Sequence, residues 1–225
     1  VFAAHHNDDF STPGAKDRIM AVPGYLLVLG HSLVPEKMAT YSAALPPIYE
    51  KYGGFYLGIG GPGRGVEHLE GLWFERSIVL GRFDQPADVS KFWCSPEYEE
   101  AKKLRKDGGE FNVFKIAGNE HEAPLGEPAF LVSVYRVLDS DAYAPLAKAE
   151  EEKLSNRDVP YILKATDKET ERLEGDLIDH DFSVAAFPTQ ASATSYWNDP
   201  GHKELRDARS KVAVFNSFLI RGVRR

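Results

Sequence analysis

The sequence predicts an α+β fold in which two ferredoxin-like βαββαβ repeats follow one another along the chain and pack sheet to sheet. Three observations lead to this prediction. The second half of the chain repeats the first half, both halves show the same order of strand-like and helix-like segments, and the size suits one large or two small cores. The chain has 225 residues, of which 43% are hydrophobic.

The internal repeat is clearest where LEGLWFERSIVLGRF at 69–83 aligns with LEGDLIDHDFSVAAF at 173–187. The same register continues without a gap from FNVFKIAG at 111–118 to FNSFLIRG at 215–222. Identical pairs are spread along the block: Glu70/Glu174, Gly71/Gly175, Phe83/Phe187, Ala87/Ala191, Trp93/Trp197, Pro96/Pro200, Glu100/Glu204, Arg105/Arg209, Phe111/Phe215, Asn112/Asn216, Phe114/Phe218, Ile116/Ile220 and Gly118/Gly222. Matches of this kind in one register indicate a tandem duplication.

Each copy contains four expected strands, which are short or apolar segments bounded by turn residues. In the first copy these are 25–33, 54–59, 71–83 and 111–118, and in the second they are 129–137, 159–165, 175–187 and 215–222. The segments between them are expected to be helical, with interruptions at prolines. These helical segments are 35–52 with a break at Pro46–Pro47, 86–106 with a break at Ser95–Pro96, and 140–155 with a kink at Pro145.

The repeat also sets the expected domain organisation. Residues 1–22 are predicted to form an N-terminal arm, 23–118 the first repeat, 119–128 a linker and 129–225 the second repeat. One ferredoxin-like unit carries helices on one face of its sheet only, so its other face has to be covered. A tandem copy can cover it, which makes the chain an internal pseudo-dimer. The sequence leaves open whether two chains also form a homodimer.

Composition narrows the range of partners. The net charge of −7 and the lack of a Lys/Arg stripe argue against nucleic acid. No apolar run approaches the roughly 20 residues of a membrane span, and the single cysteine, Cys94, leaves no disulfide framework. We expect a small-molecule substrate and a cytoplasmic location. The sequence leaves open whether a targeting peptide has been removed, because the chain starts at Val1 rather than Met.

The stretch GIGGPGRG at 58–65 places three glycines in the register of a dinucleotide-binding turn. That turn requires a strand before it and a helix after it. Here VEHLEG and another expected strand follow, and the aligned stretch of the second copy, LKATDKET, has no glycine. We therefore interpret the stretch as a hairpin connection that shapes the first-half pocket, with Arg64 as its charged side chain.

The two halves resemble the dimeric α/β-barrel superfamily, and in particular the domain of unknown function 1330. The first half carries the pattern of that family: Tyr25, Tyr41, Gly53–Gly54, Leu69–Glu70–Gly71, Trp73, Glu75–Arg76, Phe83, Ser95–Pro96–Glu97–Tyr98 and Arg105. The second half keeps Tyr143, Leu173–Glu174–Gly175, Phe187, Trp197, Pro200 and Arg209, but departs at Asp179–His180 and Asp199–Pro200–Gly201–His202. The resemblance implies the fold more firmly than an activity, because its members include cofactor-free oxygenases, lyases, cyclases and haem proteins.

Alternation along the expected strands selects four candidate catalytic residues. Arg76 and His180 would be single polar residues at equivalent places on apolar strand faces. His31 would share a face with apolar neighbours on the first strand, with Tyr135 at the equivalent place in the second copy. His and Tyr can act as proton donors and acceptors, and Arg can stabilise an oxyanion. Buried residues satisfied by one hydrogen bond are the alternative interpretation.

Candidate substrate-binding residues are Arg64, Trp73, Phe74, Trp93 and Trp197, since aromatic side chains can line a pocket for a planar substrate. We expect neither a metal nor another cofactor. Residues equal in both halves, such as Arg105/Arg209, Glu70/Glu174 and Asn112/Asn216, are interpreted as hydrogen-bonding scaffold, with an Arg–Glu ion pair as one form of it.

The resulting hypothesis is a cofactor-independent enzyme that performs acid/base chemistry of the lyase, isomerase or cyclase type on a hydrophobic, oxygenated substrate. A cofactor-free or haem-using monooxygenase and a non-catalytic ligand-binding protein are the alternatives.

Overall fold

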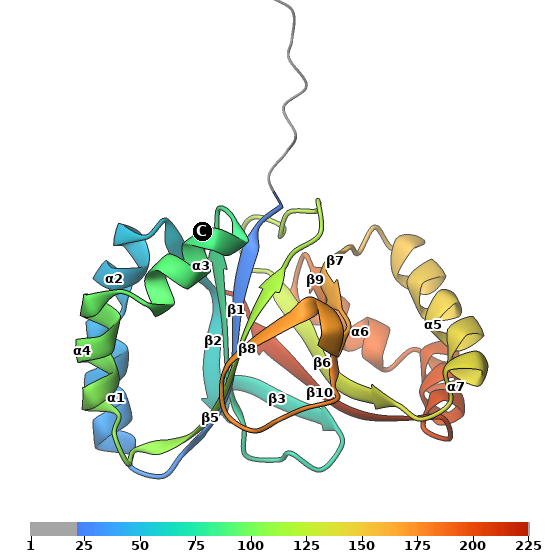
Figure 1. Cartoon of the computed structure of the whole chain (residues 1–225). Coiled ribbons are helices and arrows are strands. Elements are labelled where there is room, and N and C mark those ends of the chain that lie inside the picture. The colour runs from blue at the N-terminus through green and yellow to red at the C-terminus, as the bar shows by residue number, and fades with distance from the viewer. Residues whose placement is uncertain (1–21, 225) are drawn as a thin grey trace, which may run out of the picture.

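A computed structural model describes residues 22–224, so nearly all of the predicted N-terminal arm at 1–22 lies outside the described residues. Figure 1 shows strands at the centre of the molecule, with α1–α4 on one side and α5–α7 on the other. The first half contains β1 (Gly24–Ser32), α1 (Pro35–Ala44), α2 (Pro46–Lys51), β2 (Gly54–Pro62), β3 (Gly65–Glu70), β4 (Ser77–Phe83), α3 (Pro86–Trp93), α4 (Pro96–Leu104) and β5 (Gly109–Ala117). The second half contains β6 (Ala129–Val137), α5 (Ser140–Ser155), β7 (Tyr161–Ala165), the 3-10 turn η1 (Asp167–Glu169), β8 (Thr170–Glu174), β9 (Asp181–Phe187), α6 (Gln190–Trp197), α7 (Pro200–Arg209) and β10 (Ala213–Arg221).

The ten strands form one sheet in the order β7-β9-β6-β10-β3-β2-β4-β1-β5-β8. Each half keeps its own four-stranded ferredoxin-like core and sends one further strand to the other half. Strand β3 pairs antiparallel with β10, and strand β8 pairs antiparallel with β5. The two halves are therefore joined by backbone hydrogen bonds as well as by side-chain packing.

The largest apolar core lies where the strands of the first half face those of the second half. It includes Leu27 and Leu29 of β1 together with Val132 and Val134 of β6, all of them buried. Across the interface the Phe114 ring of β5 lies 4.6 Å from the Phe182 ring of β9, measured between centroids. Burying each such side chain contributes about 1.5–3 kcal/mol, so neither inner face would be stable exposed to water. The predicted sheet-to-sheet α+β barrel is confirmed.

Three predicted interruptions of helices behave differently. The first helical segment does divide, into α1 and α2 on either side of Leu45, and the second divides at Ser95, whose hydroxyl accepts a hydrogen bond from the Tyr98 N–H (3.2 Å). Helix α5, in contrast, runs unbroken from Ser140 to Ser155 with Pro145 inside it. Pro145 is the sixth residue of that helix, past the four N–H groups that lack an intrahelical partner, so the helix continues at the cost of the hydrogen bond to the Asp141 carbonyl.

The predicted long strands at 71–83 and 175–187 are wrong in their first six residues, because β4 starts at Ser77 and β9 at Asp181. The preceding glycines explain the difference. Gly71 and Gly175 have φ of +93° and +91°. A Cβ on either would lie 2.3 Å from an asparagine Oδ1 of the other half. The chain turns there because β3 and β8, which the sequence did not predict, have just paired with the opposite half.

Residues that are equal in both repeats form links between the halves. Arg105 donates to both carboxylate oxygens of Glu174, at 2.7 and 2.5 Å. In the mirrored arrangement Arg209 pairs with Glu70. The Oδ1 atoms of Asn112 and Asn216 accept hydrogen bonds from backbone N–H groups of the opposite half. The interpretation of these residues as a hydrogen-bonding scaffold is confirmed, including its ion-pair form.

Candidate functional site: a cavity in the first half

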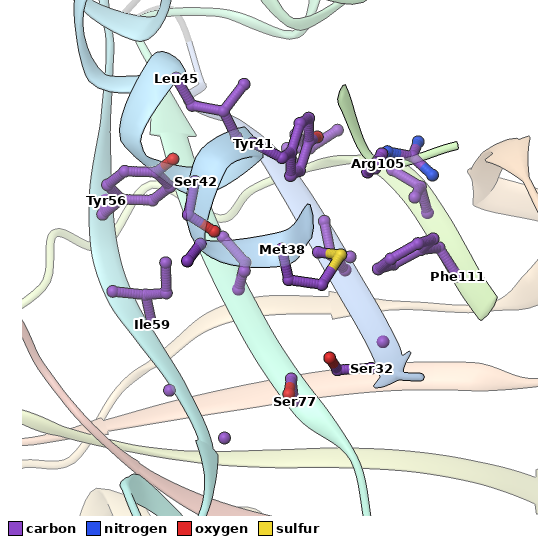
Figure 2. Close-up of a pocket in the computed structure, with 18 of the residues that line it drawn as sticks. Ser32, Met38, Tyr41, Ser42, Leu45, Tyr56, Ile59, Ser77, Arg105 and Phe111 are labelled. Atoms are coloured by element: carbon purple, nitrogen blue, oxygen red, sulfur yellow. The ribbon is translucent and has the colours of Figure 1, made fainter. Parts of the chain in front are cut away.

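A cavity of about 310 Å³ lies between the outer face of the first-half sheet and the helices above it. Figure 2 shows Met38, Tyr41 and Leu45 over one side of this space and Ile59, Ser77 and Phe111 on the sheet side. Its walls are mostly apolar, which is typical of a small-molecule site. The first-half cavity is lined by Leu26, Val28, Gly30, Ser32, Pro35, Met38, Ala39, Tyr41, Ser42, Leu45, Tyr49, Tyr56, Ile59, Gly60, Gly61, Arg64, Ser77, Val79, Tyr98, Arg105, Phe111 and Val113.

Tyrosine hydroxyls supply much of the polarity of the cavity. The hydroxyls of Tyr41 and Tyr98 lie 2.9 Å apart and share a hydrogen bond. The Tyr56 hydroxyl is buried and has no hydrogen-bond partner within the described part of the chain. A buried hydroxyl left unpaired costs roughly 1–3 kcal/mol. The hydroxyl has almost no accessible surface, so an acceptor atom on a ligand would remove that cost only after the Tyr56 ring shifts.

Burial raises the pKa of Tyr41, Tyr56 and Tyr98 above the ordinary value for a phenol. The cause is physical: a phenolate would lose its hydration in the apolar cavity. These hydroxyls therefore stay protonated at neutral pH and act as hydrogen-bond donors. Such donors can polarise a carbonyl oxygen or stabilise an oxyanion, but they are poor proton acceptors.

Arg105 forms one end of the cavity. Burial opposes its charge, but the hydrogen bonds to Glu174 outweigh it and raise the pKa of the guanidinium. The guanidinium carbon lies 4.4 Å from the centre of the Phe111 ring and 5.3 Å from that of Tyr41. Arg105 thus fixes the two aromatic walls and presents a cation whose charge Glu174 largely balances.

The second half has the same lining positions but almost no space. Strand pairing makes Tyr135 the counterpart of Gly30, because Gly30 pairs with Ser77 on β4 and Tyr135 pairs with Asp181 on β9. By the same registers, Leu26, Val28, Tyr56, Ile59, Val79, Arg105 and Phe111 correspond to Leu131, Ser133, Tyr161, Lys164, Ser183, Arg209 and Phe215, all of which line the second-half cavity. That cavity measures about 10 Å³, room for no more than one water.

These registers correct one premise from the sequence. Tyr135 is equivalent to Gly30 and not to His31, because the first strands of the two repeats are offset by one residue from the later ungapped block. Tyr135 packs on the outer, helix-covered face, stacked on Phe215. His31 lies at the end of β1 with 37% of its side chain exposed, its Nε2 3.6 Å from a carboxylate oxygen of Glu75. It does not line the first-half cavity.

The structure brings three other predicted residues together, away from the cavity. Arg76 and Trp73 lie on the loop before β4, and His180 lies on the equivalent loop before β9. The Trp73 ring centroid is 5.7 Å from the Arg76 guanidinium carbon and 5.8 Å from the His180 ring. Since neither Arg76 nor His180 belongs to a strand, the alternation argument that placed them on apolar strand faces is wrong.

The remaining predicted residues are dispersed. Arg64 lines the first-half cavity, as expected. The glycine-rich stretch at 58–65 is not the predicted hairpin connection, because residues 58–62 belong to β2 and β2 pairs with β3 in parallel. Phe74 is 63% exposed on its loop and contacts the His68 ring at 4.6 Å. Trp93 packs beside Tyr98 outside the cavity, at 4.9 Å between centroids, and Trp197 is covered by the Arg206 guanidinium at 3.9 Å.

Sequence reasoning missed Gly30, Tyr56 and the tyrosine pair as site residues. Tyr41 and Tyr98 did stand in the family pattern, but they were used only to support the fold. A signal for Gly30 existed: once the first strands are aligned with the one-residue offset, a glycine stands opposite a tyrosine at a sheet position facing the helices. Without strand pairing, that offset could not be found.

Among residues 22–224, no group of three or more His, Cys, Asp or Glu side chains is arranged to hold a metal ion. None of the helices found there is both long and apolar enough to cross a membrane.

Comparison with known proteins places the chain. The family model of the domain of unknown function DUF1330 matches residues 23–119 and again residues 128–223. No curated protein matches the sequence.

Several solved structures share the fold. One is an anthrone oxidase-like protein, 12% identical, with a TM-score of 0.52 over 89% of this chain and 91% of that chain. Another, from Lactobacillus acidophilus NCFM, is described as a candidate monooxygenase and is 11% identical, with a TM-score of 0.51 over 89% of this chain and 94% of that chain. A third, from Fusobacterium nucleatum subsp. nucleatum, carries the same description and is 12% identical, with a TM-score of 0.50 over 91% of this chain and 99% of that chain. At such identities the likeness shows the fold alone.

Proposed function

The chain belongs to the DUF1330 family, as a tandem of two copies, and we propose that only its first copy binds a substrate, a hydrophobic small molecule with an acceptor oxygen. We further propose that the reaction is cofactor-independent acid/base chemistry of the lyase, isomerase or cyclase type. The observation that carries this is the contrast between a cavity of about 310 Å³, lined by residues that include Tyr56 with its buried, unpaired hydroxyl, and an equivalent space of about 10 Å³.

The cavity supports stabilisation of negative charge on the substrate. Its neutral phenols and Arg105 can donate to a carbonyl oxygen as the neighbouring carbon loses a proton, which is the step shared by these reaction types. Among the described lining residues there is no histidine, carboxylate or lysine. The proton acceptor in this proposal is therefore water or a basic group of the substrate itself. The protein contributes by stabilising the negative charge that develops on the oxygen, which lowers the free-energy barrier to proton removal.

The superfamily resemblance also implies haem for some members, and the cavity can be tested for it. Haem iron is held by His, Cys, Tyr or Met side chains. The lining offers Met38 and tyrosines, but burial raises the pKa of Tyr41 and Tyr98, which are already bonded to each other. A phenol that resists ionisation is a poor iron ligand, and a methionine holds haem iron together with a histidine, which the described lining lacks, so the cavity does not fit a haem.

Anthrone, a flat ketone with an acidic CH₂ group, tests the proposal. Exchange of its CH₂ protons in D₂O, followed by NMR under nitrogen, should be faster with the protein than in buffer alone. Tyr56→Phe should slow the protein-dependent exchange by at least tenfold, since one oxyanion donor is worth roughly 10²–10³ in rate. Tyr196→Phe is the matched control, because the Tyr196 hydroxyl is also buried and unpaired among the described residues but lies outside the cavity. Exchange at the buffer rate, or equal loss in both variants, would overturn the proposal.

A monooxygenase is the second candidate, favoured because similar structures are described as candidate monooxygenases and as anthrone oxidase-like. The same substrate separates the two. Oxygenation converts anthrone and one O₂ to anthraquinone and one water, so an oxygen electrode would record one O₂ consumed per anthrone. Proton exchange without oxygen uptake supports the first function, and stoichiometric uptake supports the second.

A further inference from the structure

We infer that the ligand of the first-half cavity carries a hydroxyaryl ring stacked on Phe111 above Gly30, and that Tyr135 is a built-in occupant of the equivalent place in the second half. This inference rests on the proposed function only for the position of the binding site. It adds the chemical class of the ligand and the residue that determines where it binds.

The second half shows the occupied arrangement. The Tyr135 ring lies parallel to the Phe215 ring, with centroids 4.5 Å apart and an angle of 2° between the planes. The Arg209 guanidinium carbon lies 3.8 Å from the centre of the Phe215 ring. The ring of Tyr143, a residue of the covering helix α5, lies 6.0 Å from the Tyr135 ring, measured between centroids. A phenol is thus stacked and covered within the fold.

The first half shows the same frame with the phenol removed. Phe111 replaces Phe215, and the Arg105 guanidinium contacts its ring at 4.4 Å as Arg209 does in the second half. Gly30 replaces Tyr135, so no side chain of β1 covers the Phe111 ring at this position. Helix α1 still supplies a tyrosine, Tyr41, above the sheet, and Figure 2 shows Tyr41, Arg105 and Phe111 around one end of the cavity.

The space left by Gly30 is suited to a ring rather than to a protein side chain. A Cβ on Gly30 would lie 3.1 Å from Phe111 Cδ1, so any other residue there has to displace the Phe111 ring slightly. A free aromatic ligand can instead settle at the preferred stacking distance, and such pairs contribute roughly 0.5–1.5 kcal/mol beyond the area they bury. A ring hydroxyl adds a group that the cavity hydroxyls can pair with.

The cavity continues beyond this ring. Tyr56 pairs with Gly81 of β4, and Gly30 pairs with Ser77 of the same strand. Gly81 and Ser77 are four residues apart, which places Tyr56 and Gly30 roughly 13 Å from each other along the strand direction, at about 3.3 Å per residue. The ligand class is therefore a hydroxyaryl compound with a further apolar part, whose acceptor oxygen meets the Tyr56 hydroxyl. The ring subsite can be tested alone with p-cresol, which is the tyrosine side chain as a free molecule.

The experiment measures p-cresol and toluene binding by NMR titration of the wild-type chain, Gly30→Ala and Gly30→Tyr. The wild type should bind one p-cresol per chain, and toluene about tenfold more weakly, the equivalent of one hydrogen bond. Gly30→Ala should weaken p-cresol binding by less than Gly30→Tyr does, because its methyl group shifts the Phe111 ring but leaves most of the space open. Gly30→Tyr should lose it by more than tenfold, because its own phenol occupies the subsite. Tyr135→Gly should gain a second p-cresol site.

Each outcome decides the inference. Equal p-cresol affinity in Gly30→Tyr and the wild type would overturn it, as would toluene binding as tightly as p-cresol. If anthrone binds but p-cresol does not, the inference fails and the proposed function stands; if neither binds, both fail. Should Tyr135→Gly not fold, the Gly30 variants, which leave the second half intact, still give the answer.

Discussion

Replacing Arg209 by methionine should destabilise the protein more than the same change at its repeat partner, Arg105. Both arginines pair with a glutamate of the opposite half, but their surroundings differ. The Arg209 side chain is 4% exposed and donates to both oxygens of Glu150, at 2.8 and 2.9 Å, as well as to Glu70. Glu150 is itself only 10% exposed, whereas Glu174, the partner of Arg105, is 31% exposed.

The magnitude follows from what each change leaves behind. Without Arg209, Glu150 keeps one partner, the His202 Nε2 at 3.4 Å, and its charge is stranded in an apolar setting. Breaking a buried pair in this way costs about 3–5 kcal/mol. Without Arg105, water can reach Glu174, and the loss is limited to charge-assisted hydrogen bonds, about 1.5–3 kcal/mol. Methionine preserves much of the stem packing in both variants.

Urea unfolding of the two variants and the wild type measures the difference as a free energy of unfolding. Adding Glu150→Gln to Arg209→Met should recover at least 1 kcal/mol, because it removes the stranded charge. An Arg105→Met variant as destabilised as Arg209→Met, or a double variant with no recovery, would refute the reasoning from burial.

Three further predictions use other parts of the structure. Burial opposes the charge of Glu150, but Arg209 and His202 outweigh it and hold its pKa below the ordinary 4.5. The charged carboxylate therefore stabilises the fold fully above that pH, and this contribution is lost as the pH falls further. Glu150→Gln should flatten the acid side of a plot of unfolding free energy against pH, and an unchanged acid side would contradict this. Gly71→Ala should lower the free energy of unfolding in urea by at least 3 kcal/mol, since its Cβ would lie 2.3 Å from Asn216 Oδ1 at a φ of +93°. Gly63→Ala, at a φ of +67° and with no atom within 4 Å of its Cβ, should lower it by about 1 kcal/mol. Equal losses would show that φ alone matters. Tyr56→Phe should leave the melting temperature of the free protein unchanged or raise it, because it removes an unpaired hydroxyl. The same variant should bind anthrone more weakly. A lowered melting temperature would mean that the hydroxyl already has a partner.

The fold was largely predictable because the duplication repeats its strongest signals. Glu70/Glu174, Arg105/Arg209 and Asn112/Asn216 proved to form contacts between the halves. The sequence did not predict β3 and β8, because their pairing partners lie in the other half, more than 50 residues away. The same omission extended the next strands back to Gly71 and Gly175 and placed Arg76 and His180 on strand faces that do not exist.

The site was less predictable for a related reason. Polar residues on apolar faces directed attention to His31 and His180, whereas the cavity extends beside Gly30, a residue with no side chain. Gly30 gains meaning only beside Tyr135, and that comparison depends on a one-residue offset visible in strand pairing. Arg64 was predictable because the glycine-rich stretch at 58–65 exists in one repeat only. The proposed catalytic roles of His31, Arg76, His180 and Tyr135 stay predictions.

The central claim, that ligand binding is confined to the first half, can be tested most directly by a residue-resolved NMR titration of the isotope-labelled protein with p-cresol. Saturable amide shifts should appear around Gly30 and Phe111, while the equivalent amides at Tyr135 and Phe215 stay unshifted. Shifts of similar size in both sets, or in the second set alone, would contradict the account.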